Sequence, residues 1–460
     1  MTLIKSISGI RGTIGGKTGD SLSPLDIVKF SAAYGSWIIK RNAYAEPSVV
    51  VGRDARTTGA IVSNLVISTL QGLGINVTDT GLATTPTVEV AVTGLKASGG
   101  IIITASHNPS NWNALKLLNE KGEFLSASDG NEVLEIAASE DFEFATWDRT
   151  GKVTTDLSWN KKHIDLVLAL PETDREAIKK AGFTVAVDCI NSVGSLIVPD
   201  LLKELGVKET IILNGAPDGR FAHNPEPLPE HLTDISNIVK ERHADVGFVV
   251  DPDVDRLALV CEDGSMFGEE YTLVAVADYL LGYRKGNTVS NMSSTRALGD
   301  ITEKHGGQYF KSAVGEVNVV EEMKLRNAVI GGEGNGGIIY PGLHYGRDAL
   351  VGIALFLSHL AKSRLSCSAL RKTYPTYFMA KKKVTLDPGT DTGAILAEVK
   401  KCYSSEQLDE RDGIRIDFSN GWVQVRKSNT EPVIRIYSEG RSMEEADELA
   451  SAIIEIVKKQ

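Results

Sequence analysis

Residues 49–54 read Val-Val-Val-Gly-Arg-Asp and begin a structural unit that recurs through most of the chain. Three consecutive β-branched residues predict a buried strand, and the glycine with two polar residues behind it predicts a turn at the strand end. A helical stretch follows over about residues 60–73, and then come Gly74 and a second strand. This order of elements is typical of a βαβ unit in a mostly parallel sheet.

The same unit occurs twice more along the chain. The second copy covers residues 184–213, where the first strand leads into Asp-Cys-Ile-Asn-Ser and the helical stretch ends at Gly206. The third copy covers residues 287–309, with Ser-Ser-Thr in the turn and a glycine pair before the last strand. Three copies predict three related α/β domains, each built on a mixed sheet that is mostly parallel.

The C-terminal stretch has a different pattern. Within residues 369–460, four runs alternate between apolar and polar residues, and a charged amphipathic segment follows them. Alternation predicts an antiparallel sheet with one solvated face and helices on the other, which is an α+β domain. We therefore expect four domains, over residues 1–158, 159–264, 265–368 and 369–460.

The chain of 460 residues has a formal net charge of −11 and a pI near 5.4. That acidic balance argues against a broad nucleic-acid interface and against binding to an anionic membrane. The four cysteines have no paired spacing, so neither a disulfide framework nor a zinc site is indicated. The N-terminus lacks the apolar stretch of a signal peptide, and no apolar run is long enough to span a bilayer. We expect a cytoplasmic protein that is a monomer or a homodimer.

Residues 101–109, Ile-Ile-Ile-Thr-Ala-Ser-His-Asn-Pro, predict a buried strand that ends in a turn, because proline has no N–H for the sheet. Ser106 therefore lies just past a strand end, where α/β proteins place ligands. The hypothesis is that Ser106 carries a phosphoryl group and passes it to and from a sugar phosphate. The alternative is a serine in an ordinary turn. His107 either hydrogen-bonds the phosphate or orders the turn.

Residues 246–256 read Val-Gly-Phe-Val-Val-Asp-Pro-Asp-Val-Asp-Arg, an apolar strand that runs into carboxylates at Asp251, Asp253 and Asp255. Three oxygen-bearing groups at every second position suit a hard divalent cation, with Mg²⁺ as the first candidate and phosphorylated Ser106 as a further ligand. An EF-hand loop does not fit, because its sixth position requires Gly and Arg256 stands there. The alternative is a solvated acidic turn, although three carboxylates repel one another unless a cation holds them.

Residues 331–337, Gly-Gly-Glu-Gly-Asn-Gly-Gly, contain a formal Gly-x-Gly-x-x-Gly pattern after an apolar strand. A dinucleotide site is not indicated, because the residues that follow predict no helix. The loop either presents Glu333 and Asn335 to sugar hydroxyls on a thin backbone, or is a glycine hairpin with exposed polar tips. We expect Arg347 and Asp348 to form an ion pair beneath this loop.

Two further stretches offer positive charge to an anion. Residues 5–19 predict a Gly-rich loop around Arg11, and the Gly-Lys-Thr inside it is no Walker A motif, because Arg11 stands where that motif requires Gly. The segment Arg-Lys-Ser-Asn-Thr-Glu-Pro, residues 426–432, lies between two predicted strands of the last domain. Its candidate phosphate ligands are Arg426, Ser428, Asn429 and Thr430.

Together these motifs resemble those of the α-D-phosphohexomutase family, and the resemblance covers essentially the whole chain. Residues 104–109 are similar to the family's phosphoserine loop, and residues 251–256 to its magnesium loop. Residues 332–337 and 426–432 resemble its sugar-binding and phosphate-binding loops. Many bacterial members have Ser and a final His in the sugar loop. This chain has Asn and Gly there, a form closer to archaeal-type phosphoglucosamine and phosphomannose mutases.

The resemblance implies a fold of four domains around one central cleft. It also implies that Ser106 is the phosphoserine and that Mg²⁺ is held by Asp251, Asp253 and Asp255.

Two basic residues, Lys116 and Arg11, also follow from the resemblance. Lys116, in Asn-Ala-Leu-Lys, matches a family lysine suspected of acid/base work, and Arg11 matches the arginine of the N-terminal loop. Lys116, Arg256 and the metal ion are the expected sources of positive charge for the transferred group. A pKa of Lys116 lowered by the neighbouring cation would let it shuttle the hydroxyl proton.

The expected reaction interconverts a hexose 6-phosphate and a hexose 1-phosphate. It runs through the phosphoserine and a hexose 1,6-bisphosphate that turns end for end between two phosphate sites. The resemblance favours glucosamine phosphate as substrate, with mannose and glucose phosphates as alternatives. A metal-dependent sugar-phosphate phosphatase and a non-catalytic binder of hexose phosphates remain as other function classes. The segment at Arg426 favours a mutase, because only a mutase needs a second phosphate site.

Overall fold

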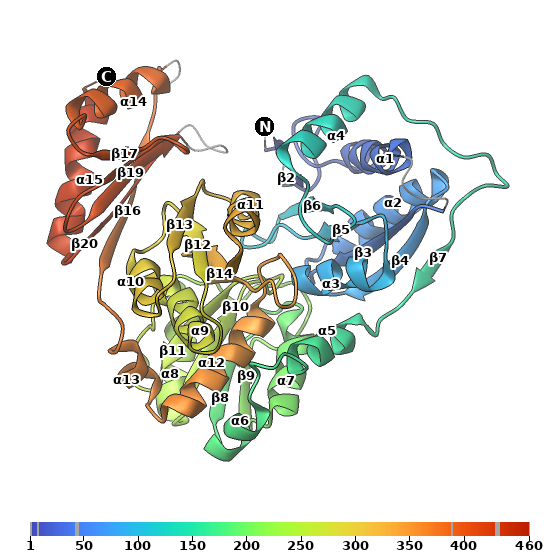
Figure 1. Ribbon diagram of the computed structural model, residues 1–460. Helices are drawn as coiled ribbons and strands as arrows, with labels where there is room; N and C mark the ends of the chain where they lie inside the picture. The colour runs from blue at the N-terminus through green and yellow to red at the C-terminus, as the bar shows by residue number, and fades with distance from the viewer. Residues whose placement is uncertain (1, 7–8, 42–45, 388–389, 428–432, 460) are drawn as a thin grey trace.

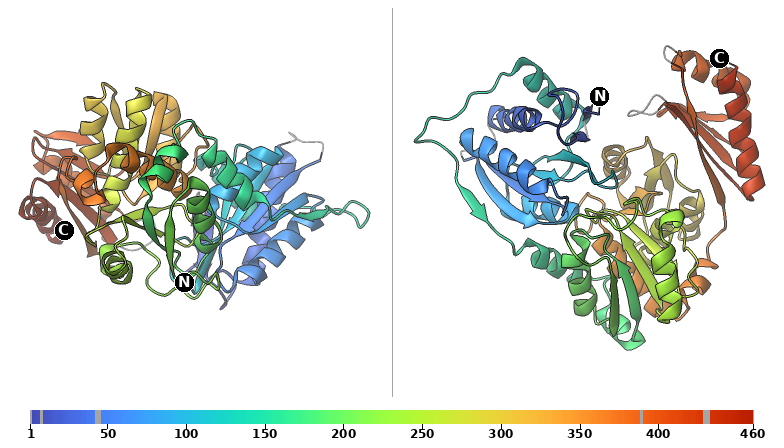
Figure 2. Two further views of the ribbon diagram at one scale, coloured as in Figure 1. Left: turned by 90° about the horizontal axis from the view of Figure 1, so that it is seen from below. Right: turned by 180° about the vertical axis from the view of Figure 1, so that it is seen from behind.

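The computed structural model describes residues 2–6, 9–41, 46–387, 390–427 and 433–459. The chain forms four sheets, and Figure 1 shows them in chain order from the right of the molecule, through its centre, to the upper left. The views from below and from behind show the same succession, with the C-terminal sheet at the end opposite the first (Figure 2). The predicted fold class, three related α/β units followed by an α+β domain, is confirmed.

The first three sheets share one topology. In each, a strand and a parallel second strand are joined by a helix, a third strand lies on the other side of the first, and a fourth strand forms an antiparallel hairpin with the third. In that order, the strands are β3 (Ser48–Arg53), β4 (Asn76–Leu82), β5 (Gly99–Ile103) and β6 (Trp112–Leu118) in the first sheet; β8 (Thr184–Asp188), β9 (Glu209–Leu213), β10 (Val246–Val250) and β11 (Leu257–Cys261) in the second; and β12 (Asn287–Asn291), β13 (Tyr309–Ser312), β14 (Ala328–Glu333) and β15 (Gly337–Ile339) in the third.

Helices cover these sheets, and several of them begin with a polar side-chain cap. Ser23 begins the first helix with a reciprocal capping box to Asp26, and Thr84 caps the third through its side chain. The helices are α1 (Pro24–Lys40), α2 (Gly59–Gly72), α3 (Thr85–Leu95) and α4 (Ala127–Ser139) around the first sheet; α5 (Trp159–Leu168), α6 (Arg175–Ala181), α7 (Gly194–Leu205), the 3₁₀ turn η1 (Pro229–His231) and α8 (Thr233–Glu241) around the second; and α9 (Glu269–Tyr283), α10 (Ala297–Lys304), α11 (Glu316–Arg326), α12 (Ala349–Ser363) and α13 (Cys367–Arg371) around the third.

The first sheet has three additional strands, which are β1 (Ile4–Ser6), β2 (Gly9–Thr13) and β7 (Val153–Thr155). Strand β2 pairs antiparallel with β6 and places Arg11 opposite Ala114. The predicted Gly-rich loop is therefore wrong over its first half. A Cβ at Gly9 would collide with the carbonyl of Leu115, so the glycine permits the close pairing with β6.

The C-terminal domain is an antiparallel sheet with two helices, as predicted from its alternating pattern. Its sheet runs in the order β16-β20-β19-β18-β17. Helix α15 buries residues at helical spacing, and its first turn is capped by Ser442. The elements are β16 (Phe378–Thr385), α14 (Thr392–Cys402), β17 (Gln407–Asp409), β18 (Ile414–Asp417), β19 (Trp422–Lys427), β20 (Val433–Gly440) and α15 (Met443–Lys458).

The hydrophobic core is divided unequally among the units. One continuous cluster joins the second and third units, because α5, α6 and α7 of the second pack against α12 of the third, and β11 of the second packs against α9 of the third. The first unit and the C-terminal domain each have clusters of their own. Polar contacts connect the C-terminal domain to the third unit: Arg296 donates to the Gly421 carbonyl at 2.6 Å, and Lys311 pairs with Asp417 at 2.6 Å.

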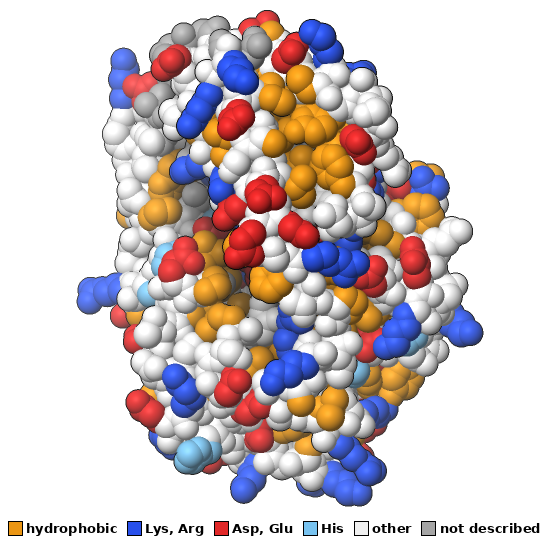
Figure 3. All heavy atoms as spheres, turned by 90° about the vertical axis from the view of Figure 1, so that its left-hand side faces the viewer, with side chains coloured by type: hydrophobic (Ala, Val, Ile, Leu, Met, Phe, Trp, Pro, Cys, Tyr) orange, Lys and Arg blue, Asp and Glu red, His pale blue; other side chains and the backbone are white. Residues whose placement is uncertain are grey.

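Charged side chains of both signs are spread over the face drawn in Figure 3, and acidic side chains gather near its middle. Across the described ranges, none of the helices combines the length and the apolar character needed to cross a membrane.

Candidate active site

The three loops singled out in the sequence occupy equivalent places in the three α/β units. Each is the turn of the hairpin between the third and fourth strands: residues 104–111 between β5 and β6, residues 251–256 between β10 and β11, and residues 334–336 between β14 and β15. Each third strand is parallel to the first, so each turn begins at the carboxyl edge of its sheet, where α/β proteins bind ligands.

The turn that carries Ser106 is held by hydrogen bonds to its backbone. Ser106 has a φ of +48°, a left-handed conformation that is unusual for serine. Its N–H donates to Thr104 Oγ1 at 3.0 Å, and Arg56 donates to the carbonyls of Ser106 and Asn108 at 2.6 Å each. These contacts offset the unfavourable backbone conformation and fix the direction of the Ser106 side chain.

Arg56 is itself held by Asp54, and both residues are fully buried. Asp54 Oδ2 accepts hydrogen bonds from Arg56 Nε at 3.1 Å and from Thr104 Oγ1 at 2.7 Å. The sequence analysis did not single out Arg56. Its position in the sequence could have indicated this role. Arg56 follows β3, and β3 pairs in parallel with β5, so the residues after these two strands lie at the same edge of the sheet.

Replacing Arg56 by Met is expected to lower the free energy of unfolding by about 3–5 kcal/mol, because it leaves the buried Asp54 carboxylate without its cation. Urea unfolding followed by circular dichroism measures this. Arg53→Met is the matched control: Arg53 is half-buried and donates to the Asp54 carbonyl at 3.2 Å, so we expect a loss of about 1 kcal/mol. An equal decrease in the free energy of unfolding in the two variants would contradict the conclusion that Arg56 stabilises this turn.

Ser106 contacts residues 251–256, which we call the acidic loop. Its Oγ donates a hydrogen bond to Asp251 Oδ2 at 2.8 Å, although the two residues belong to different units. The other oxygen of Asp251 accepts the backbone N–H groups of Asp255 and Arg256 at 3.1 Å each. Val254, which directly precedes Asp255, has a φ of +61°, an outlier for a β-branched residue. This backbone conformation folds the loop tightly around Asp251.

The three aspartates of this loop suit a divalent cation. All are fully buried, and one carboxylate oxygen from each lies within 4.8 Å of those from the other two. Asp253 Oδ1 and Asp255 Oδ1 have no hydrogen-bond partner among the described residues. Burial raises the pKa of Asp251 well above its ordinary value, and the charges of Asp255 and Asp253 raise it further. A hard cation with oxygen ligands would relieve both the repulsion and the unpaired oxygens.

Lys116 on β6 reaches the same aspartates. Its Nζ lies 2.7 Å from Asp253 Oδ2 and 3.4 Å from Asp255 Oδ2. Burial alone would lower the pKa of Lys116, but the two carboxylates raise it above its ordinary value. Lys116 is therefore a cation in this arrangement, and the lowered pKa expected beside a bound metal ion stays a prediction.

Further positive charge surrounds Ser106. Burial lowers the pKa of Arg11, and the charges of Arg256 and Arg347 lower it further. Arg256 lies 3.9 Å from Asp255 and 3.9 Å from Glu226. The Nε atoms of Arg11 and Arg256 are buried and have no hydrogen-bond partner in the described part of the chain, so both can donate to an anion.

His107 lies beside the nucleophile candidate. Its Nδ1 is 3.4 Å from Ser106 Oγ. The charge of Arg256 holds the pKa of His107 well below its ordinary value, and burial lowers it further, so the imidazole is neutral.

Arg347 links the acidic loop to the sugar loop (residues 332–337). Its guanidinium lies 2.7 Å from Asp255, 2.9 Å from Glu333 and 3.0 Å from Glu316. The predicted ion pair between Arg347 and Asp348 is wrong, because the Asp348 side chain turns away and accepts from two histidines. Consecutive residues at the start of a helix point in different directions, which the sequence pattern did not reveal.

The chain was compared with known families and proteins. Models of the phosphoglucomutase/phosphomannomutase family match in order: alpha/beta/alpha domain I over residues 3–144, domain II over 161–264, domain III over 268–377 and the C-terminal domain over 382–456. The chain belongs to the α-D-phosphohexomutase family. Members of this family are isomerases that act by phosphoryl transfer.

Several phosphohexomutases are similar over nearly their whole length. A Thermococcus kodakarensis protein named phosphoglucomutase/phosphomannomutase is 37% identical over 454 residues, covering 97% of this chain and 98% of that protein. A Sulfurisphaera tokodaii phosphoglucosamine/phosphogalactosamine mutase is 31% identical, covering 98% of each. The crystal structure of a phosphoglucomutase/phosphomannomutase family protein from Burkholderia thailandensis has the same fold, with a TM-score of 0.85 at 24% identity, covering 99% of this chain and 98% of that one.

The sugar loop of this phosphohexomutase is glycine-rich because it is tightly packed. Added Cβ atoms would collide with the Glu270 carboxylate at Gly334, with the Leu257 carbonyl at Gly336, and with the Arg347 side chain at Gly337. Glu333 is buried, and besides Arg347 its carboxylate accepts from Asn291 Nδ2 at 2.9 Å and from the Gly315 N–H at 3.1 Å. Asn335 Oδ1 accepts from the Gly337 N–H at 3.2 Å.

Arg426 stands apart from this cluster. It lies on β19, opposite Arg435 of β20, and its Nε has no partner among the residues described. The segment between these strands was predicted to carry the phosphate ligands Ser428, Asn429 and Thr430, which lie outside the described residues. The structure thus brings Ser106, the three aspartates and Lys116 together. Within the described ranges, no hydrogen bond or ion pair joins Arg426 to that group.

Proposed function

We propose that this phosphohexomutase interconverts glucosamine 6-phosphate and glucosamine 1-phosphate through a phosphorylated Ser106. The observation that carries the proposal is the hydrogen bond from Ser106 Oγ to Asp251, inside a buried group in which one oxygen each of Asp253 and Asp255 has no hydrogen-bond partner among the described residues. The sugar is supported by the Sulfurisphaera tokodaii relative and by the Asn and Gly of the sugar loop. The higher identity to a phosphoglucomutase/phosphomannomutase keeps glucose and mannose phosphates as the second candidates.

In the proposed reaction, the bond between phosphorus and Ser106 Oγ breaks as the free hydroxyl of the sugar phosphate bonds to phosphorus. The hydroxyl proton leaves and Ser106 Oγ gains one, so Ser106 is restored as an alcohol. Lys116, Arg11 and Arg256 balance the charge of the transferred group, and His107 accepts or donates a hydrogen bond beside it. The resulting bisphosphate turns end for end, and its other phosphate returns to Ser106.

Mg²⁺ is the proposed cation, held by Asp251, Asp253, Asp255 and Ser106. Bound there, it would supply Lewis-acid stabilisation of the transferred phosphoryl group. In the proposed site, Glu333 and Asn335 bind sugar hydroxyls. The segment at Arg426, with Ser428, Asn429 and Thr430, binds the phosphate that is not reacting.

One assay separates the function classes. The protein is incubated with Mg²⁺, a trace of hexose 1,6-bisphosphate and, in parallel, the 1-phosphates of glucosamine, glucose and mannose. We expect each isomer to form, fastest from glucosamine 1-phosphate. Release of free phosphate without isomer would favour a phosphatase, and a faster rate on glucose or mannose 1-phosphate would contradict the proposed sugar.

Replacing Arg426 by Ala is expected to raise KM for the hexose phosphate by about 10–100-fold, the equivalent of one or two charge-assisted hydrogen bonds. Steady-state kinetics measures this. Lys382→Ala is the matched control, because Lys382 lies on the same sheet and pairs with Asp447 at 2.7 Å on helix α15. An unchanged KM in Arg426→Ala would remove this residue from the substrate site.

A further inference from the structure

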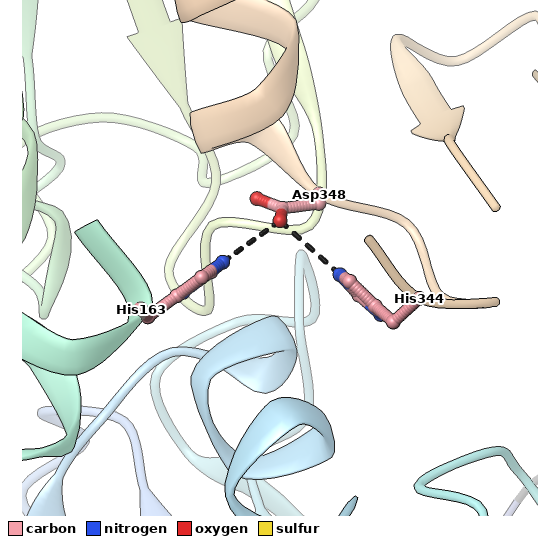
Figure 4. A group of neighbouring side chains, drawn as sticks. All are labelled: His163, His344 and Asp348. Carbon is pink, nitrogen blue, oxygen red and sulfur yellow. Dashed lines mark hydrogen bonds and ion pairs between the residues drawn. The ribbon is translucent and has the colours of Figure 1, made fainter. Parts of the chain in front are cut away.

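A buried polar cluster lies behind the acidic loop. Asp348 Oδ2 accepts hydrogen bonds from His163 Nε2 at 2.9 Å and from His344 Nε2 at 3.1 Å (Figure 4). His163 comes from α5, His344 from the loop after β15, and Asp348 is the N-cap of α12, where its other oxygen accepts from the Leu350 N–H at 2.8 Å. The three side chains are almost completely buried.

The outer nitrogens of both histidines connect back to α3. His163 Nδ1 is 3.0 Å from Thr87 Oγ1, and His344 Nδ1 is 3.2 Å from Glu89 Oε2. The five side chains therefore form a closed ring that begins and ends on α3 of the first unit. Burial would lower the pKa of His344, but Asp348 and Glu89 raise it, and burial raises the pKa of Glu89 to about 8.

The ring reaches the proposed active site at two points. At the start of α3, Thr85 donates to Asp253 twice, from Oγ1 to the carboxylate at 2.5 Å and from its N–H to the carbonyl at 2.9 Å. On the opposite side, Arg347 directly precedes Asp348 and pairs with Asp255. Two of the three aspartates are therefore held by residues that adjoin the ring.

We propose that His163 and His344 are positioning residues for phosphoryl transfer, because they fix α3 and Arg347 relative to each other and so set the spacing of Asp253 and Asp255. This inference rests on the proposed function. Each imidazole nitrogen of the two histidines has a partner within the ring. Asp253 and Asp255 belong to the second unit, whereas α3 belongs to the first. Loss of the ring would therefore let the first unit shift against the acidic loop without unfolding either.

The test compares kinetics in folded variants. We expect His163→Leu to lower kcat about tenfold or more and to raise the Mg²⁺ concentration for half-maximal activity, since residues supporting metal ligands typically contribute 10–100-fold. His359→Leu is the matched control. His359 lies on α12, the helix that Asp348 caps, and its Nε2 hydrogen-bonds Tyr374 Oη at 2.8 Å, away from the site. We expect it to lower Tm and to leave kcat and the Mg²⁺ requirement unchanged.

If His163→Leu does not fold, the test uses a second pair of variants, His163→Gln and His163→Asn. Gln places an amide N–H near the position of Nε2 and Asn near that of Nδ1, so His163→Gln can still donate to Asp348. We expect kcat of His163→Gln to exceed that of His163→Asn about tenfold. Equal kcat values for these two variants, or an unchanged kcat and Mg²⁺ requirement in folded His163→Leu, would overturn the proposal.

Elemental analysis gives an independent readout. The parent protein and His163→Leu are both analysed for transition metals. A stoichiometric ion in the parent that is absent from the variant would mean that the histidines bind a metal ion, and this would overturn the proposal. The proposed function fails separately. Parent activity in Asp253→Asn would refute the proposed site, whereas an inactive Asp253→Asn beside a fully active His163→Leu would refute only the role of the histidines.

Discussion

Ser106→Ala is expected to lower mutase kcat by about 10⁴-fold or more, because removing a nucleophile abolishes the covalent route and leaves only binding. The fold should survive, since Ser106 Oγ donates one side-chain hydrogen bond to Asp251 and the turn is held through its backbone by Arg56 and Thr104. Mass spectrometry of protein incubated with hexose 1,6-bisphosphate should find phosphate on Ser106 in the parent and none at this position in the variant.

Ser98→Ala is the matched control for that experiment. Ser98 precedes the other end of β5, is buried, and accepts a hydrogen bond from the Ser48 N–H at 3.1 Å, so a comparable bond is lost far from the turn. We expect its kcat to equal that of the parent. Isomerisation by Ser106→Ala at the parent rate would show that the phosphoryl group is carried by another residue.

Asp253→Asn is expected to lower kcat by about 10³-fold, because it removes one of three buried charges proposed to hold the cation and weakens stabilisation of the transferred group. Chelation with EDTA should abolish parent activity, and added Mg²⁺ should restore it. The variant should need a higher Mg²⁺ concentration for its residual rate. Titration of activity against Mg²⁺ measures both effects.

Asp263→Asn separates loss of a carboxylate from loss of a metal ligand. Asp263 lies in the exposed turn after β11, where it accepts from the Ser265 N–H at 2.9 Å. Its kcat and Mg²⁺ requirement should match the parent. Parent-like activity of Asp253→Asn after chelation would exclude a metal ion at the three aspartates.

Local patterns in the sequence predicted the three α/β units and the loops at their strand ends. A strand followed by a polar turn depends on neighbouring residues, so Ser106 and the three aspartates could be proposed as site residues without tertiary information. Arg56, Thr85 and Arg347 were missed as site residues because their roles depend on contacts across 50 or more residues. Strand β2 was missed because glycine disfavours strands unless a neighbouring backbone must approach closely.

The domain boundaries near residues 158, 264 and 368 remain predictions, but the packing shows how the units are coupled. The second and third units share one apolar core. The first unit joins this pair through polar contacts of Ser106, Lys116 and Thr85 and through the apolar packing of α3 against Trp159 of α5. The acidic loop and the sugar loop therefore project from two units that share one core. Separating these two units would expose a large apolar surface. A change of shape that kept this core intact would have to move the first unit or the C-terminal domain against it.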